Sequence, residues 1–173
     1  MTLSQPLCVL ICTAALSSSV AAAIAQISPQ MFDPSRGVVL TGPEGQSVAQ
    51  TCGGTSKSAG WTLNFQDIDQ LERKLAPLLA ADLQNGGSAS TVRQYYRQYA
   101  TGRLGTRRAI FVNGFHEHYV AFDAGKTDWH RTAVDVTDGG DSYWCAIYIK
   151  ETGDFVKFKS HHLDTHVWFH GLA

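Results

Sequence analysis

The stretch that decides the fold runs from Ser142 to Ile149 and reads Ser-Tyr-Trp-Cys-Ala-Ile-Tyr-Ile. Successive side chains of a strand point to opposite faces, and here both sets are apolar or aromatic. Such a strand is covered on both sides, in the middle of a sheet. The short loop Lys150–Asp154, with Gly153 suited to a left-handed conformation, predicts a hairpin to a further strand at Phe155–Lys159.

Three more strands are expected around this hairpin, at Arg107–Phe115, Trp129–Val136 and Thr165–His170. The segment Asp138-Gly139-Gly140-Asp141 precedes the central strand and has the composition of a turn. Asp138 and Asp141 are carboxylates that could act together in catalysis. Aspartate is also a preferred turn residue, because its side chain bonds to the local backbone, and we therefore assign both to the turn.

Two helices are expected before the strands. In the first, apolar residues recur at helical spacing after the N-cap candidate Asn64, and Pro77 predicts a kink. These apolar residues are Ile68, Leu71, Leu75, Leu78, Leu79 and Leu83. The second helix is expected at about Ser90–Ala100, from a stripe of Val92 and three tyrosines.

Helices followed by strands predict an α+β fold, in which one or two N-terminal helices pack on a twisted antiparallel sheet of four to five strands. We expect one shared core between the first helix and the sheet. Its expected members are Leu71, Leu75, Leu79, Ile110, Val112, Ile147 and Phe158.

The first 25 residues predict the compartment. Met1–Ala25 is apolar, rich in small residues and ends in Ala23-Ile24-Ala25, which is typical of a secretory signal peptide cleaved before Gln26. An uncleaved membrane anchor is the alternative. Residues 26–60 are expected to form a flexible lead-in, and residues 61–173 a single domain.

Cleavage would remove Cys8 and Cys12 and leave Cys52 and Cys145. In an exported protein two remaining cysteines predict a disulfide. The alternative is that Cys52, within Thr51-Cys52-Gly53-Gly54, is a nucleophile paired with a histidine.

The charge of the chain excludes some partners. Lysine and arginine number 14, aspartate and glutamate 15, and the net charge is −1. Strong attraction to nucleic acid or to anionic lipid is therefore not expected. After signal cleavage we also expect no membrane association, because no later apolar run is long enough to cross a bilayer.

Histidines are the candidate metal ligands. In an extended His116-Glu117-His118 segment both imidazoles would share one face, about 7 Å apart, and zinc could bind there with His130, Asp123 or Asp128. A solvated loop without metal is the alternative. A second group, His161, His162, Asp164, His166 and His170, surrounds Trp168 and is expected to lie on the surface.

The segment His116–Asp128 is long for a hairpin connection, and long loops on a rigid sheet are often functional. We expect His116, His118 and Tyr119 to contact a partner, with Trp168 as a second aromatic contact. The alternative is that Tyr119–Phe122 forms an additional strand.

Three segments carry a family resemblance. They are Gly105-Thr106-Arg107-Arg108-Ala109-Ile110-Phe111-Val112-Asn113-Gly114-Phe115, Asp138-Gly139-Gly140 with Trp144 and Tyr148, and Phe169-His170-Gly171-Leu172-Ala173. Over residues 61–173 the chain resembles an uncharacterised family of small exported proteins of Gram-negative bacteria. The resemblance implies a fold and a compartment and supplies no activity. The order of elements is also loosely similar to cystatin-like and nuclear transport factor-like folds.

These observations predict an exported, periplasmic binding protein without a cofactor, most concretely an inhibitor or immunity-type protein that acts on an exported partner enzyme. The sequence contains no phosphate-binding glycine loop, nucleophile elbow or zinc-protease motif. A histidine-dependent hydrolase, with or without metal, and an accessory protein of the cell envelope are the alternatives.

Overall fold

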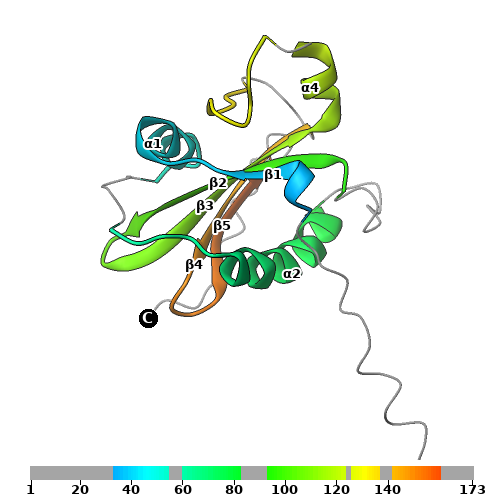
Figure 1. Ribbon diagram of the computed structural model, residues 1–173. Coiled ribbons are helices and arrows are strands. Elements are labelled where there is room, and N and C mark those ends of the chain that lie inside the picture. Colours follow the sequence, from blue (N-terminus) through cyan, green and yellow to red (C-terminus); the bar gives the residue numbers. More distant parts are fainter. Residues whose placement is uncertain (1–32, 55–59, 83–92, 124–125, 137–141, 161–173) are drawn as a thin grey trace, which may run out of the picture.

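The computed structural model describes residues 33–54, 60–82, 93–123, 126–136 and 142–160. Within them a mixed sheet of five strands carries helices on both faces (Figure 1). The strands lie in the order of the sequence: β1 (Gly37–Val39), β2 (Tyr95–Leu104), β3 (Arg107–His116), β4 (Tyr143–Ile149) and β5 (Asp154–Ser160). Strand β1 is parallel to β2, and the other neighbours are antiparallel. The expected α+β fold is confirmed, with a mixed sheet in place of a wholly antiparallel one.

The expected central strand is confirmed as β4, which is buried at every position and lies between β3 and β5. Strands β3 and β5 also form where the sequence predicts them. Gly153 has a φ of 70° in the turn between β4 and β5. This left-handed conformation is the one that glycine adopts without steric penalty.

Helix α2 (Phe65–Asp82) is the first expected helix and covers one face of the sheet (Figure 1). The Asn64 side chain accepts from the backbone N–H of Asp67 at 2.9 Å, and the Asp67 carboxylate accepts from the N–H of Asn64 at 3.4 Å. This reciprocal pair satisfies backbone donors that the first turn leaves free. The helix continues through Pro77 to Asp82.

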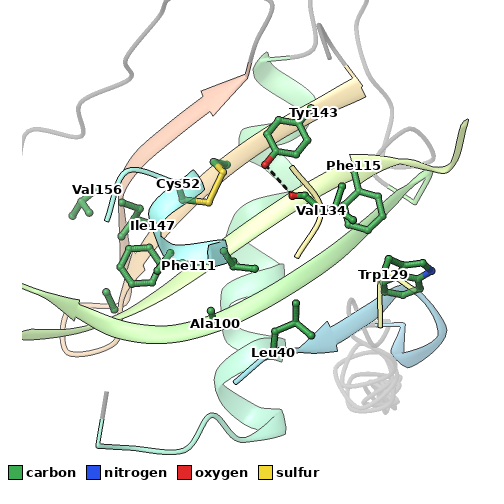
Figure 2. Close-up of a cluster of buried hydrophobic side chains, with 14 of the residues drawn as sticks. Leu40, Cys52, Ala100, Phe111, Phe115, Trp129, Val134, Tyr143, Ile147 and Val156 are labelled. Carbon is green, nitrogen blue, oxygen red and sulfur yellow. Dashed lines mark hydrogen bonds between the residues drawn. A yellow bond between two sulfur atoms is a disulfide. The ribbon is translucent and has the colours of Figure 1, made fainter. Parts of the chain in front are cut away.

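Two buried clusters, one on each face, take the place of the single expected core. The α2 cluster contains six of the seven predicted core residues: Leu71, Leu75, Leu79, Ile110, Val112 and Phe158. The seventh, Ile147, is buried in the opposite cluster, because alternate residues of β4 point to opposite faces. That second cluster surrounds the disulfide and includes Phe111, Phe115, Trp129 and Val134 (Figure 2).

The helix expected at about Ser90–Ala100 is wrong, because Tyr95–Leu104 forms strand β2. Tyrosines fit the pleated surface of a sheet at least as well as a helix. A two-residue turn joins Leu104 to its partner Arg107, and Gly105 takes a φ of 61° within it. Tight turns of this kind are typical of antiparallel hairpins.

The expected flexible lead-in is wrong for residues 34–51. A short 3-10 turn (Pro34–Arg36) leads into β1, and helix α1 (Gly42–Thr51) follows. This helix buries Val48 and Ala49 against the face of the sheet opposite α2. The segment lacks a long apolar pattern because it contributes only one short strand and three turns of helix.

The strand expected at Trp129–Val136 is also wrong. Residues 126–136, here called the strap, are irregular and lie over the α1 side of the sheet. Several backbone groups of the strap bond to the side chains of Gln98 and Asn113 and not to a neighbouring strand. The segment His116–Asp128 is neither a long loop nor an added strand, because Glu117–Asp123 forms helix α4.

Several predictions fall outside the described residues. They concern the signal peptide, the strand at Thr165–His170, the turn aspartates Asp138 and Asp141, Trp168 and the histidines around it. Among the described helices, none combines the length and the apolar character needed to cross a membrane.

Leu75→Ala should lower the free energy of unfolding by about 3 kcal/mol, because it removes apolar contacts and leaves a cavity. Leu75 is fully buried between α2 and the sheet. Chemical denaturation monitored by tryptophan fluorescence measures the change, and Gln70→Ala, at an exposed position of the same helix, is the control. A loss below about 0.5 kcal/mol for Leu75→Ala would contradict the packing described here.

Candidate functional site

The candidate site lies where β3 ends and α4 begins. We call this region the histidine corner and define it as His116, Glu117, His118 and Tyr119 with Arg36. Arg36 bonds to the Glu117 carboxylate at 2.9 Å, and both side chains are partly exposed. The Arg36 guanidinium also lies 4.9 Å from the ring centre of Tyr96. The corner is thus connected to the start of β1 and to β2, elements distant in the sequence.

The two histidines lie side by side, with ring centroids 4.6 Å apart. The His116 Nδ1 accepts a hydrogen bond from the backbone N–H of His118 at 3.2 Å, and its ring meets Tyr95 edge to face at 5.2 Å. Burial, and then the charge of His118, lowers the pKa of His116 below its ordinary value of 6.5. His116 is therefore neutral and fixed at neutral pH, whereas His118 is exposed.

An aromatic base supports the corner. Tyr119 is half-buried and packs edge to face on Phe115, with 5.8 Å between ring centroids. Phe115 in turn contacts Trp129 of the strap at 5.8 Å, and Trp129 contacts Tyr96 at 4.8 Å. Aromatic pairs in this geometry add to the stability gained from burial alone. The Tyr119 ring is therefore partly structural, and the exposed surface of the corner rests on a rigid base.

The predicted zinc site gains no third ligand. Among the described residues, no three histidine, cysteine, aspartate or glutamate side chains converge in a metal-binding arrangement. His130 instead lies 3.3 Å from Asp128 within the strap. The side chain of Asp123 is outside the described residues. Zinc binding thus stays a prediction that rests on His116 and His118 alone.

The predicted disulfide is confirmed, because Cys52 and Cys145 are bonded, with their Cα atoms 5.2 Å apart. The bond joins the end of α1 to the middle of β4 in the second cluster (Figure 2). Both sulfur atoms take part in the disulfide, so Cys52 is not a free nucleophile. The bond contributes stability to the face of the sheet that carries the strap.

Two buried amides hold the strap in place. Gln98 donates to the carbonyls of Trp129 and Thr132 at 2.6 and 2.7 Å, and its oxygen accepts from the Val134 N–H at 2.8 Å. Asn113 donates to Gln98 at 3.1 Å and to the carbonyl of Val134 at 2.7 Å. Buried polar groups require such partners, and these bonds fix one path for an irregular segment.

Sequence reasoning missed this network, although a signal was present. Asn113 interrupts the apolar run Ile110–Phe115, and a polar residue in a buried strand needs a specific partner. The neighbouring Gly114 has a steric function, because a Cβ there would lie 2.0 Å from the Trp144 ring. The Asn-Gly pair of the resemblance motif is thus explained by packing of the strap and of Trp144.

A buried ion pair was also missed. Glu72 of α2 and Arg97 of β2 lie 3.0 Å apart, and their side chains are only 1% and 8% exposed. Tyr99 donates to the same Glu72 oxygen at 2.7 Å, and Arg97 donates to the carbonyl of Tyr95 at 2.9 Å. Burial raises the pKa of Glu72, while the charge of Arg97 opposes this effect. The pair couples helix to sheet and is closed off from solvent.

In comparisons with protein-family models, curated proteins and solved structures, nothing matches this chain. The resemblance to small exported bacterial proteins therefore stays an expectation from the motifs.

Proposed function

We propose that this chain is an exported binding protein that acts on a partner protein, most concretely as an inhibitor or immunity-type protein of an exported enzyme. The histidine corner is the proposed contact surface. The observation that carries the proposal is that the exposed His118 lies beside His116 and Tyr119, whose rings are held against Tyr95 and Phe115. Rigid presentation of polar and aromatic groups lowers the entropy lost on binding.

The proposed compartment is supported by the disulfide, since such bonds persist in oxidising surroundings outside the cytoplasm. The apolar segment Met1–Ala25 is consistent with export. Mass spectrometry of the exported protein should give a chain that begins at Gln26 and carries no free thiol.

Binding through the corner is tested in two steps. The immobilised protein is first offered the exported proteins of its own host, and a captured enzyme is purified and assayed with increasing amounts of the chain. Inhibition at a one-to-one ratio is expected. Tyr119→Ala should then weaken binding by at least about 1 kcal/mol, as is usual for an aromatic contact residue.

Because Tyr119 packs on Phe115, its truncation also removes internal contacts. Two further variants separate binding from folding. His118→Ala changes an exposed side chain and should weaken binding without lowering the melting temperature, while Gln70→Ala on α2 is the exposed control. Unchanged binding by both His118→Ala and Tyr119→Ala would exclude the corner as the contact surface.

A further inference from the structure

A row of three cations crosses the sheet at the end opposite the histidine corner. Arg103 of β2 lies directly opposite Arg108 of β3, and the backbone N–H of Lys150 donates to the Arg108 carbonyl at 3.0 Å. The three residues therefore follow one another across three adjacent chain segments. We call Arg103, Arg108 and Lys150 the cationic row.

All three side chains are on the α2 face of the sheet. Residues two positions apart in a strand share a face. Arg108 shares it with Ile110 of the α2 cluster, and the Lys150 ammonium, just beyond the end of β4, bonds to Asp67 of α2. The turns β2–β3 and β4–β5 lie at one end of the sheet, while α4 lies at the other (Figure 1).

The indole of Trp61 lies among these cations. Its centre is 5.1 Å from the Lys150 ammonium and 5.9 Å from the Arg108 guanidinium, and its N–H donates to the carbonyl of Gly102 at 3.3 Å. Cations are attracted to the face of an indole ring. Trp61 therefore helps to hold two like charges close together.

The carboxylates nearby do not neutralise the whole row. Glu151 pairs with Arg108 at 2.8 Å, and Asp67 pairs with Lys150 at 2.7 Å. Arg103 is exposed and bonds to a carbonyl of its own hairpin, that of Thr106. In the part of the chain that the structure describes, no ion pair joins Arg103 to a carboxylate.

Arg107, which follows the same hairpin turn, is not part of the row, because it alternates with Arg108 along β3 and shares its face of the sheet with Ala109 and Phe111 of the second cluster. Like charges directly opposite each other in a sheet are destabilising, so the Arg103–Arg108 pair lowers the stability of the hairpin. The excess of positive charge is local, since the whole chain has a net charge of −1.

We propose that the cationic row binds a carboxylate-rich segment of a partner protein. Guanidinium groups bind carboxylates with two parallel hydrogen bonds, and the indole offers an apolar contact beside them. A peptide with a few carboxylates matches this small surface. Nucleic acid fits less well, because its binding at physiological salt depends on the neutralisation of many phosphates.

This surface is separate from the histidine corner. Arg108 and His116 are eight residues apart along β3, which corresponds to about 27 Å. Failure of the corner to bind a partner therefore leaves the proposal for the row unaffected, and the reverse also holds.

The test uses a fluorescein-labelled octaglutamate peptide and the full chain, with binding measured by fluorescence anisotropy. We expect binding at about 20 mM NaCl that weakens at about 150 mM, because salt screens exposed charges. Arg103→Gln should raise the Kd by up to about five-fold, which is the upper end of the contribution of an exposed ion pair. Arg103→Lys, which keeps the charge, should retain most of the binding.

Arg73→Gln is the matched control, because Arg73 is an exposed arginine of α2 that pairs with Asp69. It should bind the peptide like the unchanged protein. Arg103→Gln should also raise the melting temperature, because it removes a like-charge contact while the Arg108–Glu151 pair remains. If Arg103 had only a structural function, Arg103→Gln would lower the melting temperature.

Three outcomes would overturn the proposal. One is no peptide binding at low salt. Another is equal binding by Arg103→Gln and the unchanged protein. The third is binding of an octathymidylate as tight as that of octaglutamate, which would identify a general polyanion surface.

Discussion

Replacing Cys52 and Cys145 together by alanine should lower the free energy of unfolding by about 4–5 kcal/mol. The two cysteines are 93 positions apart. On the chain-entropy model, a bond that closes a loop of this length strongly restricts the unfolded chain, which stabilises the folded state relative to it. Urea denaturation of both proteins, followed by circular dichroism, measures the difference.

A reducing agent provides the control for this prediction. It should destabilise the unchanged protein to a similar extent and leave the double variant unaffected. If the double variant lost less than about 1 kcal/mol, the bond would not be closing a long loop in the unfolded chain, and the pairing would be contradicted.

Arg97→Met should lower the free energy of unfolding by about 3–5 kcal/mol, because it leaves the buried Glu72 carboxylate without its counter-charge. Glu72 and Arg97 lie 3.0 Å apart under α2. Replacing both residues, as Glu72→Leu with Arg97→Met, removes the two buried charges together. The double variant should therefore be more stable than Arg97→Met, and a double variant as unstable as the single one would contradict the pairing.

The decrease in the free energy of unfolding caused by Arg97→Met should also depend on pH. Burial already raises the pKa of Glu72 above 4.5, and loss of the Arg97 charge should raise that pKa further. Above pH 4.5 the Glu72 carboxyl is ionised in the unfolded chain but still protonated in the folded variant. The free energy of unfolding of Arg97→Met therefore falls as the pH rises. The destabilisation measured by denaturation should thus be larger at pH 8 than at pH 5, and a pH-independent loss would exclude a titrating Glu72.

Local sequence patterns predicted the elements whose structure is set by near neighbours. The spacing of Ile68, Leu71 and Leu75 and the cap at Asn64 predicted α2, because both signals act within a few residues. The apolar run Tyr143–Ile149 predicted a central strand for the same reason. The cysteine count predicted the disulfide, since exclusion of the first 25 residues left only one pairing.

Elements that depend on distant contacts were missed or assigned wrongly. The tyrosines of residues 95–99 fit a helical stripe, and only pairing with β3 makes this segment a strand. The strap follows a path set by Gln98 and Asn113, which are distant from it in sequence. Its irregular backbone therefore has no periodic signal.

For the candidate site, the sequence by itself determined the composition, and the tertiary structure determined the arrangement. The histidine pair and Tyr119 were visible as residues, but only the fold places Tyr119 on Phe115, His116 on Tyr95 and Glu117 beside Arg36. Glu72 falls within the apolar stripe of α2, a sign of a buried charge, yet its partner comes from β2. The cationic row exists only through strand register. The periodicity of a sequence indicates which face of a helix or strand a residue occupies. Which faces pack against each other is determined by strand register and by packing, and both depend on contacts between segments that are distant in the sequence.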